Sequence, residues 1–403
     1  MRKRLAALFL LCALLLSGCS ESNEVENLAY VLILGLDLMD DGQIRVCAQI
    51  PKITGKDDAS NGSGDGSELV FSAEGDSFPE AMSRLEWIVP RRLDLSQLQL
   101  VIVSEKMARS DRFAAAATSM MDAYRLYTAA RLAVCAGEAK AFVEQETMLI
   151  GSRISTELTA MFENYTDSGY IPDVQFADVY YKTQSVYSDP VAIYAAQGEA
   201  DESAKEDAPA WAAVDSDAVQ NTASAQPDVA DSPSVQPALP RDADTASATS
   251  PQANRFLGAA VFVGGRMVGR LDGPQTLFCN LLSGKKQTFN MTADDQSLSL
   301  STQGRPSVSV DVSAEPLRID VKLRVALLPD SEITDAEAAQ KALTRELMET
   351  VSACKRMGAE PFQFAEIAAR SFSTLERWQT YDWRARWLES EVNVEVEVTR
   401  REL

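Results

Sequence analysis

Hydrophobic and polar positions divide the chain into stretches with different patterns. The first stretch opens with a continuous apolar run at residues 28–36. A run of this length is typical of a strand buried on both faces. Asp40-Asp41-Gly42 is a turn signal and residues 43–51 continue as a second strand, so the pattern predicts a hairpin. Further strands are predicted at 69–73, 97–103 and 131–136.

Helical patterns lie between these strands. Ser77-Phe78-Pro79-Glu80 has the form of a capping box with proline in the first turn, and Pro90 ends the segment. The apolar positions between them recur at helical spacing: Phe78, Met82, Leu85 and Val89. Further helices are predicted at 111–124, 138–145 and 152–164. Alternating strands and helices predict a sheet with helices packed on it.

The last third of the chain has the clearest alternation. Apolar residues occupy every second position of 307–313, 317–327 and 391–399. We interpret these segments as half-buried antiparallel strands that are wet on one face. Between them, Thr334 is the predicted cap of a long helix that reaches Cys354, and a second helix is predicted at 362–371. An aromatic group follows, which we interpret as core and not as a ligand cage: Trp378, Tyr381, Trp383 and Trp387.

One middle segment differs sharply in composition. Residues 197–254 are mostly Ala, Asp, Ser, Pro, Gln and Thr, with Trp211 as the single aromatic residue. Such a segment buries too little apolar area to offset its ordering entropy, which predicts disorder. After it, two strands around the Gly264-Gly265 turn and a helix at 275–282 are predicted.

These patterns predict an α+β, multidomain protein with mixed or antiparallel sheets and helices packed on them. We expect a signal peptide at 1–18 and an N-terminal α+β domain at 19–145. A middle domain would combine 146–196 with 255–291, interrupted by the acidic disordered insert 197–254. A C-terminal α+β domain, an antiparallel sheet with a long helix, would follow at 296–403. The 403 residues, 46% of them apolar, suffice for several cores.

The first nineteen residues have the layout of a secretory signal peptide. Three cations at positions 2–4 precede an apolar run of 12 residues at 5–16, shorter than the ~20 needed to span a bilayer. Leu16-Ser17-Gly18-Cys19 resembles a bacterial lipobox, in which the cysteine receives a diacylglyceryl group and becomes the new N-terminus. The alternative is a plain signal peptide with a chance cysteine. We expect a lipid anchor at Cys19, because two acyl chains give stable anchoring.

Charge and residue types exclude several functions. The formal net charge of −21 argues against nucleic acid, because no excess of cations exists to displace counterions from phosphate. It also argues against binding to anionic lipid by charge, so the anchor must hold the chain at a membrane. The chain has no histidine, which removes Ser-His and Cys-His nucleophile pairs and most zinc sites.

The remaining chemical signals have structural explanations. Four cysteines outside the signal lie in apolar patterns and are interpreted as core residues rather than disulfides or metal ligands: Cys47, Cys135, Cys279 and Cys354. Ser352-Ala353-Cys354-Lys355 matches the S-x-x-K motif of penicillin-binding enzymes, but the accompanying S-D-N and K-T-G motifs are missing. We therefore expect no catalytic residues, no metal, no cofactor and no enzymatic activity. An envelope hydrolase is the disfavoured alternative.

Several short segments, taken in order, carry a family resemblance. They are Val25-Glu26-Asn27-Leu28-Ala29-Tyr30-Val31, Gly35-Leu36-Asp37, Ser77-Phe78-Pro79-Glu80-Ala81, Pro90-Arg91-Arg92-Leu93, Val101-Ile102-Val103-Ser104-Glu105, Gly258-Ala259-Ala260-Val261-Phe262, Val268-Gly269-Arg270-Leu271, Trp378 and Asp382-Trp383. With the lipobox and the alternating last strand, they make the chain similar to the Ger(x)C family, the lipoprotein C subunits of spore germinant receptors.

The resemblance implies a three-domain α+β protein without enzymatic activity on the outer face of the spore's inner membrane. It would act in nutrient-triggered germination with two multi-span membrane subunits, A and B. Cys19 carries over as the lipid attachment residue. The chain departs from the family in having Ser20-Glu21 where Trp-Asp often follows the cysteine, and in the length of its acidic insert.

Two further expectations remain open at this stage. Arg91 and Arg92 are candidate contacts with a partner, against the alternative of a solvated helix end. A lipid-anchored solute-binding protein of a transporter is the alternative function, and it predicts two similar lobes around a ligand cleft. No repeated halves are visible in the sequence.

Overall fold

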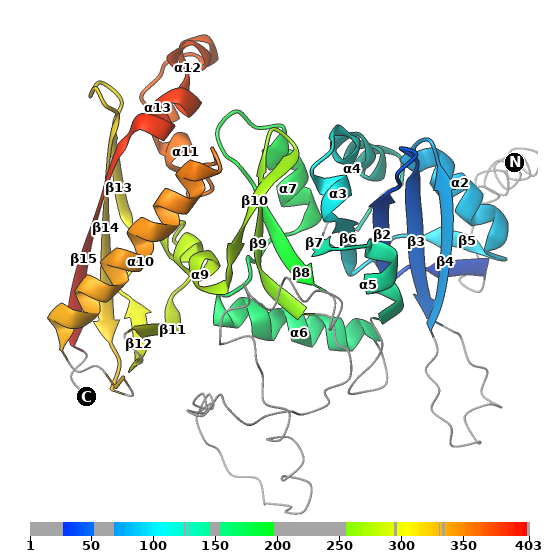
Figure 1. Cartoon of the computed structure of the whole chain (residues 1–403), viewed down its shortest axis with the longest axis horizontal. Coiled ribbons are helices and arrows are strands. Elements are labelled where there is room, and N and C mark those ends of the chain that lie inside the picture. The colour runs from blue at the N-terminus through cyan, green and yellow to red at the C-terminus, as the bar shows by residue number, and fades with distance from the viewer. Residues whose placement is uncertain are drawn as a thin grey trace, which may run out of the picture.

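The computed structural model describes residues 27–51, 68–124, 126–127, 129–145, 154–196, 255–293, 296–329, 331–332 and 335–400. Within these ranges the chain forms two main sheets with helices packed on them, and a two-stranded sheet at one end (Figure 1). This confirms the predicted multidomain α+β fold. The predicted signal peptide, Cys19 and the insert 197–254 lie outside the described residues.

The larger sheet has eight strands and a parallel centre. Its order is β10 (Arg266–Asp272), β9 (Arg255–Val263), β8 (Val191–Ala196), β7 (Arg131–Ala136), β6 (Leu100–Ser104), β2 (Ile33–Leu38), β3 (Ile44–Pro51) and β4 (Glu68–Gly75). Strands β8, β7, β6 and β2 are parallel, and antiparallel strands extend the sheet on both sides. All five side chains of β6 are buried, as expected for a parallel strand covered on both faces.

Helices cover both faces of this sheet. One face packs against α2 (Phe78–Ile88), α3 (Glu105–Ala108), α4 (Asp111–Ala123) and α7 (Phe176–Thr183). The other face packs against α5 (Ala139–Gln145) and α6 (Ile154–Ser168). Two apolar cores therefore sandwich the parallel strands, which explains the unbroken apolar runs in their sequences.

The smaller sheet has five strands and one wet face. Its strands are β11 (Thr288–Ala293), β12 (Gln296–Thr302), β13 (Ser307–Asp311), β14 (Arg318–Leu327) and β15 (Glu391–Arg400). Strands β12 and β13 pair with opposite ends of β14, and β15 pairs along its whole length. Its buried face packs against α9 (Gly273–Leu282) and α10 (Ala336–Arg356), followed in the chain by α11 (Phe364–Ala369), α12 (Leu375–Tyr381) and α13 (Trp383–Glu389).

Strand β9 links the two units because its faces serve different cores. Ala260 and Phe262 belong to a core of the larger sheet, whereas Ala259 and Val261 belong to the core shared with the smaller sheet. Successive side chains of a strand point to opposite faces, so one strand closes both cores. The two sheets therefore lie side by side along the molecule (Figure 1).

The sheets cross the domain limits expected from the sequence. The limit between residues 145 and 146 lies between β7 and β8, which are neighbours in one sheet. The segments assigned to an N-terminal and a middle domain therefore share that sheet. Likewise, β11 begins before residue 291 but pairs antiparallel with β12 of the smaller sheet. Strand pairing between segments that are distant in the sequence defines these units. A local sequence pattern does not indicate such pairing.

Three local predictions need correction. The predicted antiparallel strand at 391–399 instead forms β15, which is parallel to β14, with Ile319 opposite Val392. The four helices between them return the chain to the start of β14, as a parallel pair requires. The run 28–36 forms two strands, β1 (Leu28–Tyr30) and β2, because β1 leaves the main sheet to pair with β5 (Arg92–Asp94). The cap of α10 is Asp335, whose carboxylate accepts the N–H of Glu337 at 3.1 Å.

Candidate functional site

The predicted contact residues Arg91 and Arg92 lie where α2 ends and β5 begins. The hydroxyl of Ser77 accepts the N–H of Glu80 at 3.4 Å and caps α2, which confirms the predicted helix start. Pro90 follows the last turn, because the residue before a proline disfavours helix. Both arginines are exposed, and neither forms an ion pair with another residue of the described ranges.

Two large apolar side chains are exposed at the same place. Trp87 is 82% exposed and Ile88 is 53% exposed. They sit on the last turn of α2, outside the helix face that is buried, which carries Phe78, Ala81, Met82 and Leu85. We call Trp87, Ile88, Arg91 and Arg92 the α2–β5 corner. Exposed aromatic and aliphatic groups beside arginines are the composition of an interaction surface.

The local charge of the corner is cationic. Arg84, one turn earlier on α2, pairs with Glu80 at 2.6 Å between Nη2 and Oε1 and is thereby neutralised. Glu86 is the exposed carboxylate that lies next to Trp87 in sequence. The two arginines of the corner therefore carry its positive charge, with Glu86 and Asp94 as acids nearby in sequence, in a chain whose overall charge is −21.

The corner is fixed to the start of the described chain. Parallel pairing of β1 with β5 places Leu28 opposite Arg92 and Ala29 opposite Leu93. The N–H of Val31 donates to the carbonyl of Asp94 at 3.0 Å. Ala29 and Leu93 are buried in the core of the eight-stranded sheet, so the corner cannot move independently of it. Figure 1 shows α2 and β5 at the end of the molecule opposite β13–β15.

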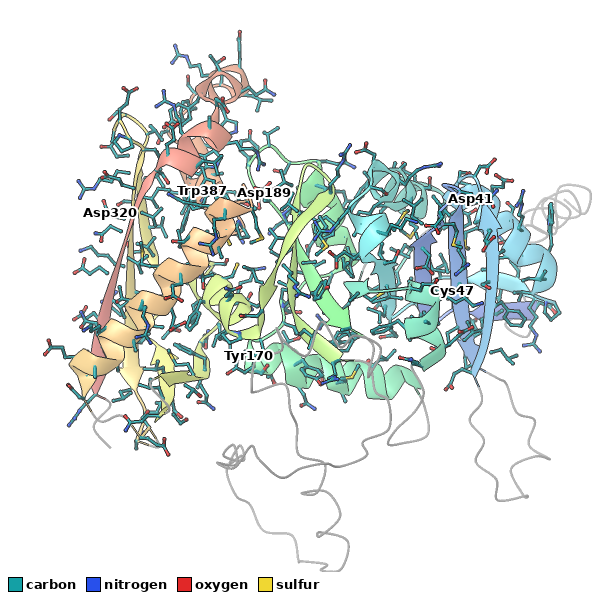
Figure 2. The ribbon with its side chains drawn as sticks, in the orientation of Figure 1. Asp41, Cys47, Tyr170, Asp189, Asp320 and Trp387 are labelled. Carbon is teal, nitrogen blue, oxygen red and sulfur yellow. The ribbon has the colours of Figure 1, made fainter. Side chains whose placement is uncertain are left out.

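A second constellation joins the two main sheets. Asp189, just before β8, is buried and accepts the N–H of Glu360 at 2.8 Å. It also accepts Nη2 of Arg384, before the last strand, at 2.7 Å. We call Asp189, Glu360 and Arg384 the polar joint; Figure 2 shows Asp189 near Trp387 at this place. These bonds tie the eight-stranded sheet to the helices of the smaller sheet.

The carboxylate of Glu360 is enclosed within the joint. It accepts the N–H groups of Phe364 and Ala365, each at 3.0 Å, in the first turn of α11. Burial raises the pKa of Glu360 to about 8, and the Asp189 carboxylate adds to the rise, although the two N–H groups oppose it. Since the group is enclosed and hydrogen-bonded, it serves the packing of α11.

Asp37 plays a comparable part inside the larger sheet. It accepts the N–H groups of Ala139 and Lys140 at 2.7 and 3.0 Å, in the first turn of α5. Burial raises the pKa of Asp37, against the lowering effect of these N–H groups. Both buried acids therefore hold short helices in place.

The residues considered for catalysis are placed apart or enclosed. Ser352 donates to the carbonyl of Met348 at 2.8 Å, whereas the Nζ of Lys355 lies 5.0 Å from the centre of the Trp387 ring. The S-x-x-K residues thus form no nucleophile and base pair. All four cysteines of the described ranges are free and buried, and burial raises the pKa of Cys279 to about 12. Cys47 lies inside the larger sheet (Figure 2). The described residues contain no group of three metal-ligating side chains.

Some functional candidates were missed from the sequence. Trp87 and Ile88 carried a usable signal, because they fall outside the apolar face that the predicted helix presents to the core. The polar joint carried no signal in the sequence, because Asp189 and Glu360 are 171 positions apart. Cys19, the predicted lipid attachment residue, lies outside the described residues. Among the described helices, none is long and apolar enough to cross a membrane.

Comparisons with known proteins match both halves of the chain. The spore germination protein N-terminal domain matches residues 21–197, and the spore germination B3/GerAC-like C-terminal domain matches 257–402. The gap between the two matched ranges nearly coincides with the predicted insert at 197–254. The spore germination protein KC of Bacillus subtilis (strain 168) is 32% identical over 110 residues, which are 27% of each chain. The matched stretch thus spans about a quarter of that relative's length.

The crystal structure of the GerBC protein also aligns with the chain. The TM-score is 0.49 at 11% identity, over 92% of this chain and 97% of that one. Two family domains, in order and covering most of the sequence on both sides of the insert, carry the assignment. The chain therefore belongs to the Ger(x)C family of spore germination proteins.

Proposed function

We propose that the chain is the C-type subunit of a nutrient germinant receptor, anchored by a diacylglyceryl group on Cys19. In this role it faces outward from the spore's inner membrane and works with the multi-span A and B subunits. The subunit is non-catalytic and contributes binding surfaces. Its function is to help assemble or operate a receptor that starts germination.

The observation that carries this proposal is the ordered match of both germination domains along the chain. The apolar run and the Leu16-Ser17-Gly18-Cys19 motif support the anchor. Enclosed cysteines and the separation of Ser352 from Lys355 support a non-catalytic role.

The structure gives less support to a solute-binding protein. That class predicts two similar lobes around a ligand cleft. Here one unit has an eight-stranded sheet with a parallel centre, and the other has a five-stranded sheet around β14. Direct binding of a metabolite by the purified full chain would favour this alternative.

Spores that lack the gene provide the first test. We expect slow release of dipicolinate in response to nutrients, full recovery with the wild-type gene, and weak or no recovery with Cys19→Ala. Cys12→Ala is a matched control, because it changes a cysteine of the signal and leaves the attachment residue. Equal recovery by Cys19→Ala and Cys12→Ala would contradict the anchor, and normal germination of the deletion spores with every nutrient would contradict the receptor role.

A further inference from the structure

We propose that the α2–β5 corner docks on an anionic bilayer surface. Trp87 and Ile88 would enter the boundary between headgroups and acyl chains, and Arg91 and Arg92 would bind lipid phosphates. The inference rests on the proposed anchor at Cys19, which brings the chain to the membrane and does not orient it. The corner supplies the orientation.

The chemistry of the corner fits a bilayer surface better than water. Tryptophan is enriched at the interface because its ring is apolar and its N–H is polar. With 82% of its surface exposed, Trp87 gains little from the protein and is free to bury itself in lipid. Arginine presents a planar fork that matches phosphate oxygens, so Arg91 and Arg92, which follow the apolar pair closely in the chain, suit the headgroup layer.

The path of the chain places the corner within reach of the anchor. Leu28 pairs with Arg92 in the β1–β5 sheet, and nine peptide units separate Leu28 from Cys19. Nine residues span at most about 32 Å when fully extended. The corner therefore stays near the membrane whenever Cys19 is anchored, which gives it a high effective concentration at the surface. The five-stranded sheet lies at the other end of the molecule (Figure 1).

The charge distribution favours the same orientation. The chain as a whole carries a net charge of −21, so most of its surface is repelled by anionic lipid. Arg91 and Arg92 are exposed and unpaired within the described ranges, and Glu86 is the neighbouring acid that opposes them. The two arginines of the α2–β5 corner therefore favour the orientation in which the corner faces the membrane. Such a small corner binds weakly alone and needs the anchor as a first signal.

The test uses the full lipidated chain on vesicles. Brominated acyl chains quench tryptophans that enter the bilayer, so the wild type is compared with Trp87→Phe on vesicles of phosphatidylglycerol and phosphatidylcholine. We expect quenching that Trp87→Phe abolishes. Arg91→Gln with Arg92→Gln should lower the ratio of docked to undocked molecules about tenfold on these vesicles, since each cation near an anionic surface adds to binding. On pure phosphatidylcholine the two arginines should matter little.

Matched controls and cosedimentation separate the outcomes. Arg305→Gln with Arg324→Gln removes two exposed cations from the unit of the smaller sheet, one between β12 and β13 and one on β14, and should leave the quenching unchanged. If the wild type cosediments with vesicles but Trp87→Phe does not alter quenching, the anchor stands and the docking is wrong. If the lipidated wild type fails to cosediment, the proposed anchor and this orientation both fail. Protection of Trp87 that requires reconstituted A and B subunits would assign the corner to a protein partner and overturn lipid docking.

Discussion

The α2–β5 corner and the helices α12 and α13 both contain tryptophan close to arginine in the sequence. The tryptophan is exposed in the corner and buried in α13. Trp87 beside Arg91 and Arg92 is 82% exposed, whereas Trp387, three positions after Arg384, is 1% exposed. Trp387 makes edge-to-face contacts with Phe362 and Phe364 and donates its N–H to the carbonyl of Ala359 at 3.0 Å. The difference lies in what the rest of the chain brings to each place. A tryptophan becomes core where distant segments cover it and stays exposed where none does, whereas the arginines near it are exposed in both places.

Substitution of the two tryptophans should show the largest contrast. Trp387→Ala removes a buried ring and leaves the carbonyl of Ala359 unpaired, and should lower the free energy of unfolding by about 3–5 kcal/mol. Trp87→Ala should change it by less than about 0.5 kcal/mol, because its ring is exposed. Urea unfolding of the two full-length variants measures both. Equal losses would show that the corner is part of the core and would break the comparison.

The polar joint should give the next largest effect. Asp189→Ala leaves the N–H of Glu360 without its acceptor inside the protein and should cost about 2–3 kcal/mol. Arg384→Ala should cost less, since half of that side chain is exposed and water can replace its bond. A double-mutant cycle in urea measures the coupling of the pair. A larger loss for Arg384→Ala than for Asp189→Ala would mean that the arginine, rather than the buried acid, holds the joint.

The pKa of Glu360 predicts a dependence of stability on pH. The pKa is raised from 4.5 in the unfolded chain to about 8 in the folded protein. Between these values the folded state holds a proton that the unfolded state releases, so the contribution of Glu360 to stability is full below pH 4.5 and is lost as pH rises through 8. The slope contributed by one proton is about 1.4 kcal/mol per pH unit.

Comparison of slopes isolates this residue. Urea unfolding at several pH values between 5 and 8 should show a flatter dependence for Glu360→Gln than for the wild type. Asp37, whose pKa is raised by burial, is present in both proteins and cancels. Parallel dependences in the two proteins would mean that Glu360 stays ionised, held by the N–H groups of Phe364 and Ala365.

Charge reversal at the corner should give the smallest change in stability and a clear change in function. Arg91→Glu with Arg92→Glu should shift the free energy of unfolding by less than about 0.5 kcal/mol, because both side chains are exposed. Nutrient-triggered dipicolinate release by spores carrying this variant should slow severalfold. Unchanged germination and receptor assembly would leave Arg91 and Arg92 as a solvated helix end.

The elements that sequence predicted well are those with local causes. The cap at Ser77 and the stop at Pro90 define α2 without any tertiary contact. In β14 the alternating apolar residues are all buried, and in β15 the same pattern faces the same core. The Gly264-Gly265 turn is confirmed, with positive φ values of 56° and 83°, because the mirror-image turns of tight hairpins favour glycine there.

The elements that sequence missed depend on unusual caps or on distant partners. Gln175 caps helix α7 and forms a capping box with Asp178, although glutamine is not a preferred cap. The β11–β12 hairpin alternates Phe289 and Met291 against Leu298 and Leu300, a pattern diluted by serine and threonine. The parallel direction of β15 follows from a return path through four helices, which no local pattern encodes.

The sequence likewise predicted the local features of the candidate site but not its tertiary contacts. Arg91 and Arg92 were visible as a cationic pair after a helix stop, and the structure leaves both exposed. Trp87 is recognised as a surface residue once the buried face of α2 is known to lie elsewhere. The opposition of β1 and β5, which ties the corner to the residues after Cys19, is a non-local pairing and emerged from the structure alone.

The pairing of β8 with β9 has a consequence for how this protein can change. Ala196 and Arg255 face each other across the two strands, so the 58 residues between them leave and re-enter the sheet at neighbouring points. The entropy of closing a loop grows only with the logarithm of its length. Evolution can therefore lengthen, shorten or replace this segment at little cost to folding. For the same reason, a fluorescent reporter inserted there offers a way to watch the subunit in a living spore.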